Sequence, residues 1–403
     1  MKNIDKDILD YFQNIKTYRR HIHANPEVGP IQPETVKYIK EQFSSLEDIV
    51  ITHGEEKAGV VIDIVCSKSG PTIAFRADMD ALNVSESNSS EHLPNKENFC
   101  SQFENKMHAC GHDMHTAILI GFGKIIYKYR QELKGKIRLL FQPGEEGYGG
   151  ANQMVQAKYL DGVQKVFALH CWPNLEVGQI GFRKGAFFAS VDHFLVKVNG
   201  IGGHGASPEK ASDQILAISS MISNLQSMLA RKLSGLDQRI LSIGYINAGN
   251  KKSPGVLPSF AEFGGTFRTF DENVKQKIKE QMQVICESTA RMIHEDCSVE
   301  IEYTNSYPQT VNDDKMVEKL EEVFSKHINT ENLFTNYIPT LGAEDFSFML
   351  KKVPGVLFLI GTNSKSKDIN KSVFLHNPTF DPDEQSLLHG VQAFKSLAFE
   401  FLS

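Results

Sequence analysis

The sequence lacks several features that mark large classes of protein. Its 403 residues carry a formal net charge of −6 at pH 7, so it has no basic excess of the kind that binding to a phosphate backbone requires. No run of five or more like charges occurs along it either. We therefore expect no nucleic acid partner.

Long apolar runs and a disulfide pattern are also missing. The first residues, MKNIDKDILDYFQNIK, mix charged and apolar residues at helical spacing, unlike a signal peptide, and no later stretch is apolar enough to cross a bilayer. The six cysteines lack the spacing of a small disulfide-bonded domain, which favours reduced thiols. We expect a cytoplasmic protein with no membrane partner.

The length of the chain and its hydrophobic content of 41% suit two domains. Residues 5–47 read as helix with one break at Asn25–Pro26, and residues 115–133 as a helix that stops near Gly135. Short β-rich runs at 59–65, 72–77, 136–142 and 165–170 alternate with helical segments. This predicts an α/β fold with a mostly parallel sheet flanked by helices.

The middle of the chain has a different pattern. Residues 187–304 read in the order β-α-β-β-α-β, which is typical of an α+β ferredoxin-like unit. We interpret it as a domain inserted into a catalytic domain formed by residues 1–186 and 305–403. Its antiparallel sheet should leave an edge free for a second subunit, so we expect a lid and dimerisation domain.

Polar residues follow the predicted strands of the catalytic domain. RADMD ends the strand at 72–77, PGEE follows 136–142, His170 closes the strand at 165–170, and LHNPTFDPDE lies a loop beyond VLFLIGT. Ligands of open α/β sheets bind outside the carboxyl ends of the strands. These four segments should therefore meet at one edge of the sheet.

The segment MHACGHDMHTA, residues 107–117, concentrates potential metal ligands. Only Gly111 separates Cys110 from His112, so the backbone can turn tightly and direct both side chains at one centre. An isolated pair of this kind is more often a buried thiol beside a loop histidine. His108 and His115 are expected to shape the loop and the start of the helix.

Two adjacent glutamates, Glu145 and Glu146, follow an apolar strand within PGEEGYGG. Such a pair is usually a solvated pair of surface charges. In this position, one carboxylate could bind a metal while its neighbour reaches the metal-bound water as a base. His170 and His376 are further candidates, although a histidine alone is more often structural. Together with Cys110, His112 and Glu146 they exceed the four ligands of a structural zinc site. Two ions with a shared ligand fit better.

Eight motifs occur in order along nearly the whole chain: RADMDAL (76–82), MHACGHDMHTA (107–117), FQPGEEGYGGA (141–151), LHCWP (169–173), GIGGHGASP (200–208), GTFRTF (265–270), GAEDFSF (342–348) and LHNPTFDPDE (375–384). This series resembles the dimetal amidohydrolases, which include hippurate hydrolase, N-acetyldiaminopimelate deacetylase and the auxin-conjugate hydrolases of plants. The resemblance implies a zinc-peptidase-like catalytic domain and two divalent metal ions per subunit.

The resemblance also implies a role for each matching residue. The metal-ligand positions are Cys110, His112, Glu146, His170 and His376. Glu145 falls on the general base, and His204 on a histidine that contacts substrate and steadies the oxyanion, often across a dimer interface. Asp80 matches an aspartate that orients a metal-bound histidine in related metallopeptidases, although Asp78 stands two residues before it instead of histidine.

Three further residues are candidates for supporting roles. Arg268 could grip a substrate carboxylate, because a guanidinium binds carboxylates through two hydrogen bonds; the alternative is a strand arginine paired across the sheet. Glu344 and Asp345 are expected to support a loop near the metals, or else to begin a helix.

We expect hydrolysis of N-acyl amino acids or related small amides by a homodimer that uses zinc, manganese, nickel or cobalt. A small N-acyl amino acid is the expected partner. One alternative is a dipeptidase or aminopeptidase with the same metals. Another is a non-catalytic metal-binding or ligand-binding protein, which would have no need of Glu145 or His204.

Overall fold

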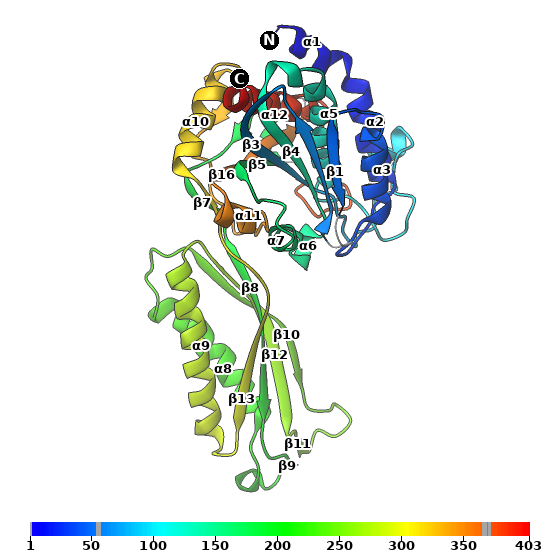
Figure 1. The fold of residues 1–403 in the computed structure, drawn as a ribbon. Helices are drawn as coiled ribbons and strands as arrows, with labels where there is room; N and C mark the ends of the chain where they lie inside the picture. Colours follow the sequence, from blue (N-terminus) through cyan, green and yellow to red (C-terminus); the bar gives the residue numbers. More distant parts are fainter. Residues whose placement is uncertain (1, 54–57, 365–368, 370–371) are drawn as a thin grey trace. The chain divides into compact units, whose positions relative to one another are not determined.

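The computed structural model describes residues 2–53, 58–364, 369 and 372–403. The chain divides into two compact units (Figure 1). Unit 1 comprises Met1–Phe187, Thr310–Ile338 and Asp345–Ser403, and unit 2 comprises Phe188–Gln309 and Pro339–Glu344. Among the described residues, no helix has both the length and the hydrophobicity of a membrane span.

Unit 1 is built on an eight-stranded sheet in the order β1-β2-β4-β3-β5-β16-β6-β15. The strands are β1 (Ile49–His53), β2 (Val60–Val65), β3 (Lys68–Asp78), β4 (Lys134–Gln142), β5 (Val163–Glu176), β6 (Ile180–Gly181), β15 (Leu333–Phe334) and β16 (Gly355–Asn363). The central strands β4, β3, β5 and β16 are parallel to their neighbours in that set. The expected fold class, a mostly parallel sheet flanked by helices, is confirmed.

Ten helices are described in unit 1: α1 (Lys2–Asp10), α2 (Phe12–Ala24), α3 (Pro33–Phe43), α4 (Leu93–Lys96), α5 (His112–Lys128), α6 (Glu145–Tyr148), α7 (Gly150–Gln156), α10 (Asp314–Ser325), α11 (Ser347–Lys352) and α12 (Ser386–Leu402). The ring of Phe75 on β3 lies 4.7 Å from that of Phe122 on α5 and 5.0 Å from that of Phe394 on α12, measured between centroids. Helices α5 and α12 therefore pack on the same face of the sheet.

The boundaries differ from the sequence-based expectation in three places. The predicted N-terminal helix has a second break at Tyr11, between α1 and α2. Helix α5 covers 112–128 instead of 115–133, and Gly135 lies inside β4 with φ +77°. Strand β5 continues past His170 to Glu176, because its pairing with β16 continues to Asn363. His170 is therefore within a strand and does not end one.

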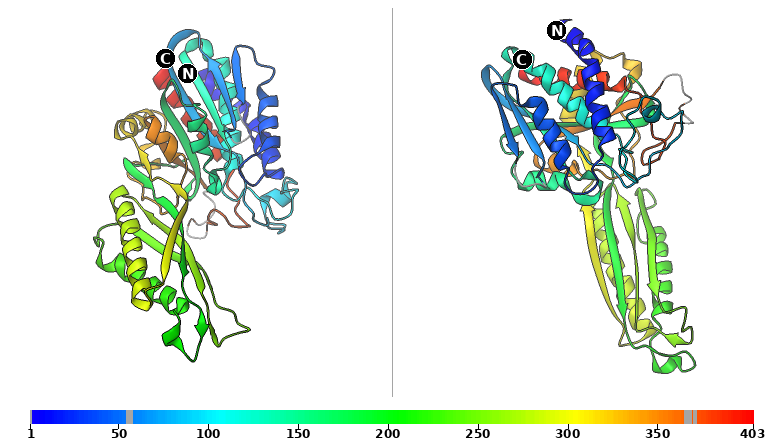
Figure 2. Two further views of the ribbon diagram at one scale, coloured as in Figure 1. Left: turned by 60° about the horizontal axis from the view of Figure 1, so that its bottom comes forward. Right: turned by 90° about the vertical axis from the view of Figure 1, so that its right-hand side faces the viewer.

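Unit 2 contains a four-stranded antiparallel sheet in the order β10-β12-β8-β13. Its elements follow as β8 (Ser190–Asn199), α8 (Gln214–Arg231), β10 (Arg239–Ala248), β12 (Phe260–Thr269), α9 (Glu272–Ile293) and β13 (Ser298–Tyr307). Helices α8 and α9 lie against this sheet (Figure 2), and their side chains share one apolar core with it. This is the ferredoxin-like arrangement.

Two short pairings complete the described strands. β9 (Gly203–His204) pairs with β11 (Val256–Leu257) in unit 2. β7 (Gly185–Phe188) pairs with β14 (Thr310–Asn312). The first of these pairings contains His204, one of the predicted site residues.

Candidate metal centre

The turn before α5 presents Cys110 and His112. Gly111 precedes the helix with φ +85°, a conformation that glycine adopts at little cost. A Cβ on this residue would lie 3.1 Å from the Cβ of Cys171, so the close approach of β5 also favours glycine. The turn lets α5 begin at His112, three residues earlier than the periodicity predicts.

The structure brings the five predicted ligands together. Ligand atoms of Cys110, His112 and His170 all lie within 4.8 Å of one another, and so do those of Cys110, Glu146 and His376. The sulfur of Cys110 is 3.6 Å from His170 Nε2 and 3.3 Å from His376 Nε2. Two triads therefore share one sulfur, which is the arrangement that a pair of ions with a bridging ligand requires.

Burial differs across the cluster. Cys110, His112 and His170 are buried, whereas the side chain of His376 is 52% exposed. His376 Nε2 lies 3.2 Å from Glu146 Oε1. The cluster thus has a buried side and a side open to solvent, as a catalytic metal site needs for its substrate.

The buried Nε2 of His112 is consistent with a bound cation. His112 Nε2 is buried and has no hydrogen-bond partner, while its Nδ1 lies 2.9 Å from the carbonyl oxygen of Asp80. Buried polar atoms nearly always have a partner, and metal-bound histidines typically use their second nitrogen in this way. Sulfur, imidazole and carboxylate donors together suit divalent zinc, manganese, nickel or cobalt.

Asp80 holds both ligand segments. Its Oδ1 accepts a hydrogen bond from the backbone N–H of Glu145 at 3.0 Å, and its Oδ2 accepts one from that of Glu146 at 2.9 Å. Oδ1 also lies 3.3 Å from His112 Nδ1. Asp80 is thus placed to orient His112 and the two glutamates at once.

Glu145 lies beside the ligand cluster. Its side chain is buried, and its ligand atom is within 4.8 Å of those of His112 and Glu146. The backbone N–H of Asp345 donates to Glu145 Oε1 at 3.3 Å. Gly144 and Gly147, with φ of +57° and +88°, form the tight turn that presents the two adjacent glutamates.

Burial and nearby carboxylates together shift the pKa values of the predicted ligands. Burial, followed by the charges of Glu146 and Glu145, raises the pKa of the Cys110 thiol well above its usual value. Burial alone would lower the pKa of His112, but Asp78 and Asp80 raise it to about 10. A cation at the sulfur would oppose these carboxylates and stabilise the thiolate. The carboxylates around Cys110 and His112 thus provide negative charge that suits a divalent ion.

Asp78 fixes a third histidine. Its Oδ1 lies 2.6 Å from His115 Nδ1, while His115 Nε2 accepts from the backbone N–H of Cys171 at 2.8 Å. Both nitrogens of His115 are therefore engaged by protein atoms, which fits a structural role.

His108 is buried without a hydrogen-bond partner on either nitrogen, and burial lowers its pKa to about 3. It is neutral.

Sequence reasoning missed a buried charge network behind the glutamates. Arg76 donates from Nε to Gln142, from Nη1 to Asp78 and from Nη2 to Asp345, at 2.8, 2.8 and 3.1 Å. The other oxygen of Asp345 accepts from the backbone N–H of Ala151 at 2.9 Å. An arginine inside an otherwise apolar strand was the signal, because buried arginine needs charged partners.

A second missed network ties α2 to the segment after His112. His23 lies 2.9 Å from Asp113 through Nδ1 and 2.8 Å from Glu86 through Nε2, and Arg19 Nε donates to Asp113 at 3.1 Å. Burial alone would lower the pKa of His23, but Asp113 and Glu86 raise it to about 9. The spacing of Arg19 and His23, four residues apart on the buried face of a helix, could have revealed it.

His204 and Arg268 belong to unit 2 and are not part of the cluster in unit 1. His204 is exposed on β9, and its Nδ1 accepts from the backbone N–H of Ala206 at 3.0 Å. Arg268 on β12 donates from Nη1 to the carbonyl oxygen of Leu341 at 2.7 Å. Neither is paired with a carboxylate among the ion pairs of the described residues.

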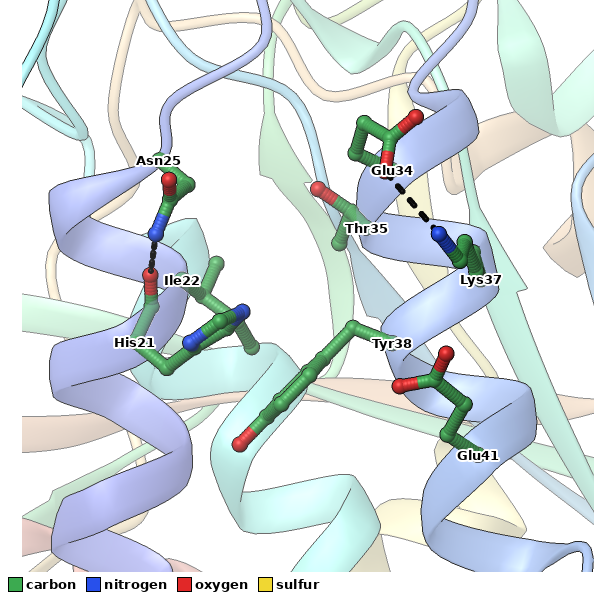
Figure 3. A pocket seen from close by; sticks show the side chains of 8 residues that line it. All are labelled: His21, Ile22, Asn25, Glu34, Thr35, Lys37, Tyr38 and Glu41. Carbon is green, nitrogen blue, oxygen red and sulfur yellow. Dashed lines mark hydrogen bonds and ion pairs between the residues drawn. The ribbon is translucent and has the colours of Figure 1, made fainter.

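A separate pocket of unit 1 lies between α2 and α3 (Figure 3). It has a volume of about 260 Å³ and is lined by His21, Ile22, Asn25, Glu34, Thr35, Lys37, Tyr38 and Glu41. The His21 imidazole stacks on the Tyr38 ring with centroids 3.9 Å apart. Burial lowers the pKa of His21. None of these eight residues is a predicted ligand, so this pocket is distinct from the metal centre.

Comparison with known proteins identifies the family. The model of peptidase family M20/M25/M40 matches residues 74–400. The chain belongs to this family. The resemblance seen in the sequence motifs is therefore confirmed.

Three relatives illustrate the range of the family. An N-acetylcysteine deacetylase of Bacillus subtilis is 35% identical over 94% of this chain and 94% of its own length. An IAA-amino acid hydrolase of Arabidopsis thaliana is 33% identical over 98% of this chain and 87% of its own. A solved Bacillus subtilis structure, described as a dinuclear metal-binding peptidase from the M20 family, has a TM-score of 0.81 at 32% identity and covers 98% of this chain and 99% of its own.

Proposed function

We propose that this member of the M20/M25/M40 family hydrolyses the amide bond of N-acyl amino acids or closely related small amides. The observation that carries the proposal is the pair of ligand triads sharing Cys110, with the Glu145 carboxylate beside His112 and Glu146. The activities named for the deacetylase and the IAA-amino acid hydrolase support an amide substrate of this kind.

The five clustered side chains would hold two divalent cations, namely zinc, manganese, nickel or cobalt: Cys110, His112, Glu146, His170 and His376. Bound there, such cations supply Lewis acidity toward the acyl carbonyl and make water more acidic. Elemental analysis of the purified protein would identify the metal.

Glu145 serves as the general base. Its buried carboxylate takes a proton from the attacking water and later delivers it to the departing amine. The Asp345 N–H and the turn at Gly144 hold this carboxylate in place. Asp80 fixes the backbone of both glutamates relative to His112, because its carboxylate accepts their N–H groups and its carbonyl oxygen contacts His112 Nδ1.

His204 and Arg268 would act on the substrate. The Nδ1 of His204 is held by a backbone N–H, which leaves Nε2 as the nitrogen available to the developing oxyanion. Arg268, which has one N–H committed to a carbonyl oxygen, has further donors for a substrate carboxylate. Both roles require unit 2, of the same chain or of a partner, to act with unit 1.

We further propose a cytoplasmic homodimer that pairs through unit 2. Strand β10 is an edge of its sheet and exposes Tyr245 and Ile246, which are 47% and 57% exposed. Exposed apolar side chains on a free edge are typical of a subunit contact. All six cysteines are free thiols, as expected in a reducing compartment. Light scattering would measure the oligomeric state.

The decisive experiment is a substrate panel on metal-reconstituted protein. N-acetyl and N-aroyl amino acids should be cleaved faster than dipeptides and amino acid amides. Preferential cleavage of dipeptides would instead support the peptidase alternative, which the M20 peptidase structure represents. Metal binding without cleavage of any panel member would support the non-catalytic alternative.

A further inference from the structure

Two aromatic residues flank the metal ligands in unit 1. Trp172 follows His170 by two residues on β5, so both side chains lie on the same face of that strand. Phe374 precedes His376 by two residues. The rings of Trp172 and Phe374 meet edge to face, with centroids 5.2 Å apart and planes at 87°. Segments about 200 residues apart in the chain thus place an aromatic pair beside two ligands.

The pair is fixed from behind. The Trp172 ring also meets the His170 imidazole edge to face, at 6.2 Å between centroids. Its indole N–H donates to the hydroxyl of Tyr337. Trp172 itself is only 7% exposed, so it supports its neighbour and offers little surface of its own.

Phe374 is the exposed member. Its neighbours Val373 and Leu375 pack against the apolar cluster of Met107, Ala109 and Phe380, whereas Phe374 does not belong to this cluster and is 44% exposed. Leaving a phenyl ring exposed forgoes the free energy that its burial would contribute. An exposed ring two residues from a predicted metal ligand is an available surface for an apolar ligand.

We propose that Phe374, held by Trp172, determines specificity for an aromatic or bulky apolar group of the substrate. This inference rests on the proposed amidohydrolase function, because it assumes that the acyl carbonyl is bound at the five ligands. The group could belong to the acyl part or to the amino acid side chain. Both sources present the same chemistry, an aryl or large alkyl surface for edge-to-face packing.

The kinetic test compares three substrates on metal-loaded enzyme: N-acetylalanine, N-benzoylalanine and N-acetylphenylalanine. Phe374→Ala should lower kcat/KM roughly tenfold or more for one of the two aromatic substrates, and less than about threefold for N-acetylalanine. Phe374→Tyr should retain the kcat/KM of the wild type, because it keeps the aromatic ring. The substrate that responds identifies which side of the amide bond contacts Phe374.

The matched control is Phe103→Ala, which removes a similarly exposed phenyl ring, 48% exposed, from a different loop of unit 1. It should change none of the three values. Unchanged metal content and melting temperature in Phe374→Ala would show that the fold is intact. Equal losses on all three substrates, or no loss on any, would refute the inference.

A binding measurement provides a second readout, because Trp172 is the single tryptophan of the chain. In the Glu145→Gln background, the favoured aromatic substrate should shift or quench its fluorescence, and Phe374→Ala should raise the resulting Kd about tenfold. Fluorescence that does not respond to saturating aromatic substrate would contradict the inference. If metal-loaded wild-type protein cleaves no panel member, the proposed function fails; if it cleaves them all and Phe374→Ala behaves as wild type, only this inference fails.

Discussion

Most of the predicted site residues of unit 1 are held differently from those of unit 2. In unit 1, Cys110, His112 and Glu145 are buried, and fixed partners such as Asp80 and Asp345 orient the neighbouring segments. In unit 2, His204 is exposed and is held only by a backbone N–H within its own turn.

The difference follows from the cost of burial. A buried polar group without partners costs roughly 2–7 kcal/mol in simple transfer measurements, and a buried charge costs far more, so the predicted metal ligands need several fixed partners. An exposed histidine stays solvated and needs none. On the proposed mechanism, the predicted metal ligands of unit 1 are held by neighbouring protein groups, whereas His204 of unit 2 would act on the substrate from an exposed position.

Removing the metals should produce the largest effect and should affect the units unequally. Chelation is expected to abolish hydrolysis and to loosen α5 and β5, because Glu145, Glu146 and Asp78 would repel one another without a cation. At a metal concentration 100 times Kd, the lost stabilisation is about 2.7 kcal/mol. Hydrogen exchange should show faster exchange in unit 1 and no change in α8 and α9. Equal loosening of both units would contradict the comparison.

Glu145→Gln should come next, with kcat about 10²- to 10⁴-fold lower. The amide side chain keeps the size of the carboxylate but takes no proton, so metal content should be unchanged. Steady-state kinetics and elemental analysis measure the two quantities. Glu132→Gln, at an exposed position of the same unit, is the control and should alter neither. Near-normal turnover in Glu145→Gln would assign the base elsewhere.

His204→Ala should lower kcat by about 10²- to 10³-fold, as removal of an oxyanion donor does. Its melting temperature and metal content should equal those of the wild type, because the side chain is exposed. A mixture of His204→Ala and Glu145→Gln subunits distinguishes the source of this histidine. We expect restored activity from sharing between subunits. A mixture that stays inactive would mean that each chain uses its own His204.

Asp80→Ala should have the smallest of these effects, a loss of metal affinity of about 10- to 100-fold. The substitution removes the acceptors of the Glu145 and Glu146 N–H groups and one contact of His112. Metal competition titrations would measure it, with Asp161→Ala, at an exposed site, as the control. An unchanged affinity would reduce Asp80 to a purely structural residue.

Much of the fold could be predicted because local patterns agreed with it. The alternation of short apolar strands with helices led to the mostly parallel sheet, and the β-α-β-β-α-β order is present in unit 2. The boundaries were less predictable where tertiary contacts override local signals. Pairing with β16 extends β5 beyond His170, and the turn at Gly111 starts α5 early.

The candidate site was predictable where chemistry-bearing residues are rare. Cys110 and His112 could be predicted as metal ligands because the chain has only 6 cysteines and 14 histidines, so their proximity is unusual. Apart from Asp78, which is two residues from Arg76, the partners of Arg76 and His23 were not predictable. Those of Arg76 lie 66 and 269 residues away, and those of His23 lie 63 and 90 residues away. No local pattern carries such pairings.

The sequence alone determined the chemical identity of the donors, the strands that deliver them and the family to which the chain belongs, because residue type, periodicity and motif order are local or linear properties. Only the tertiary structure decided that one sulfur serves two triads, that Asp80 holds both glutamates, and that Phe374 stands against Trp172. Each of these depends on distances of a few ångströms between remote segments, which are set by the packing of the whole unit.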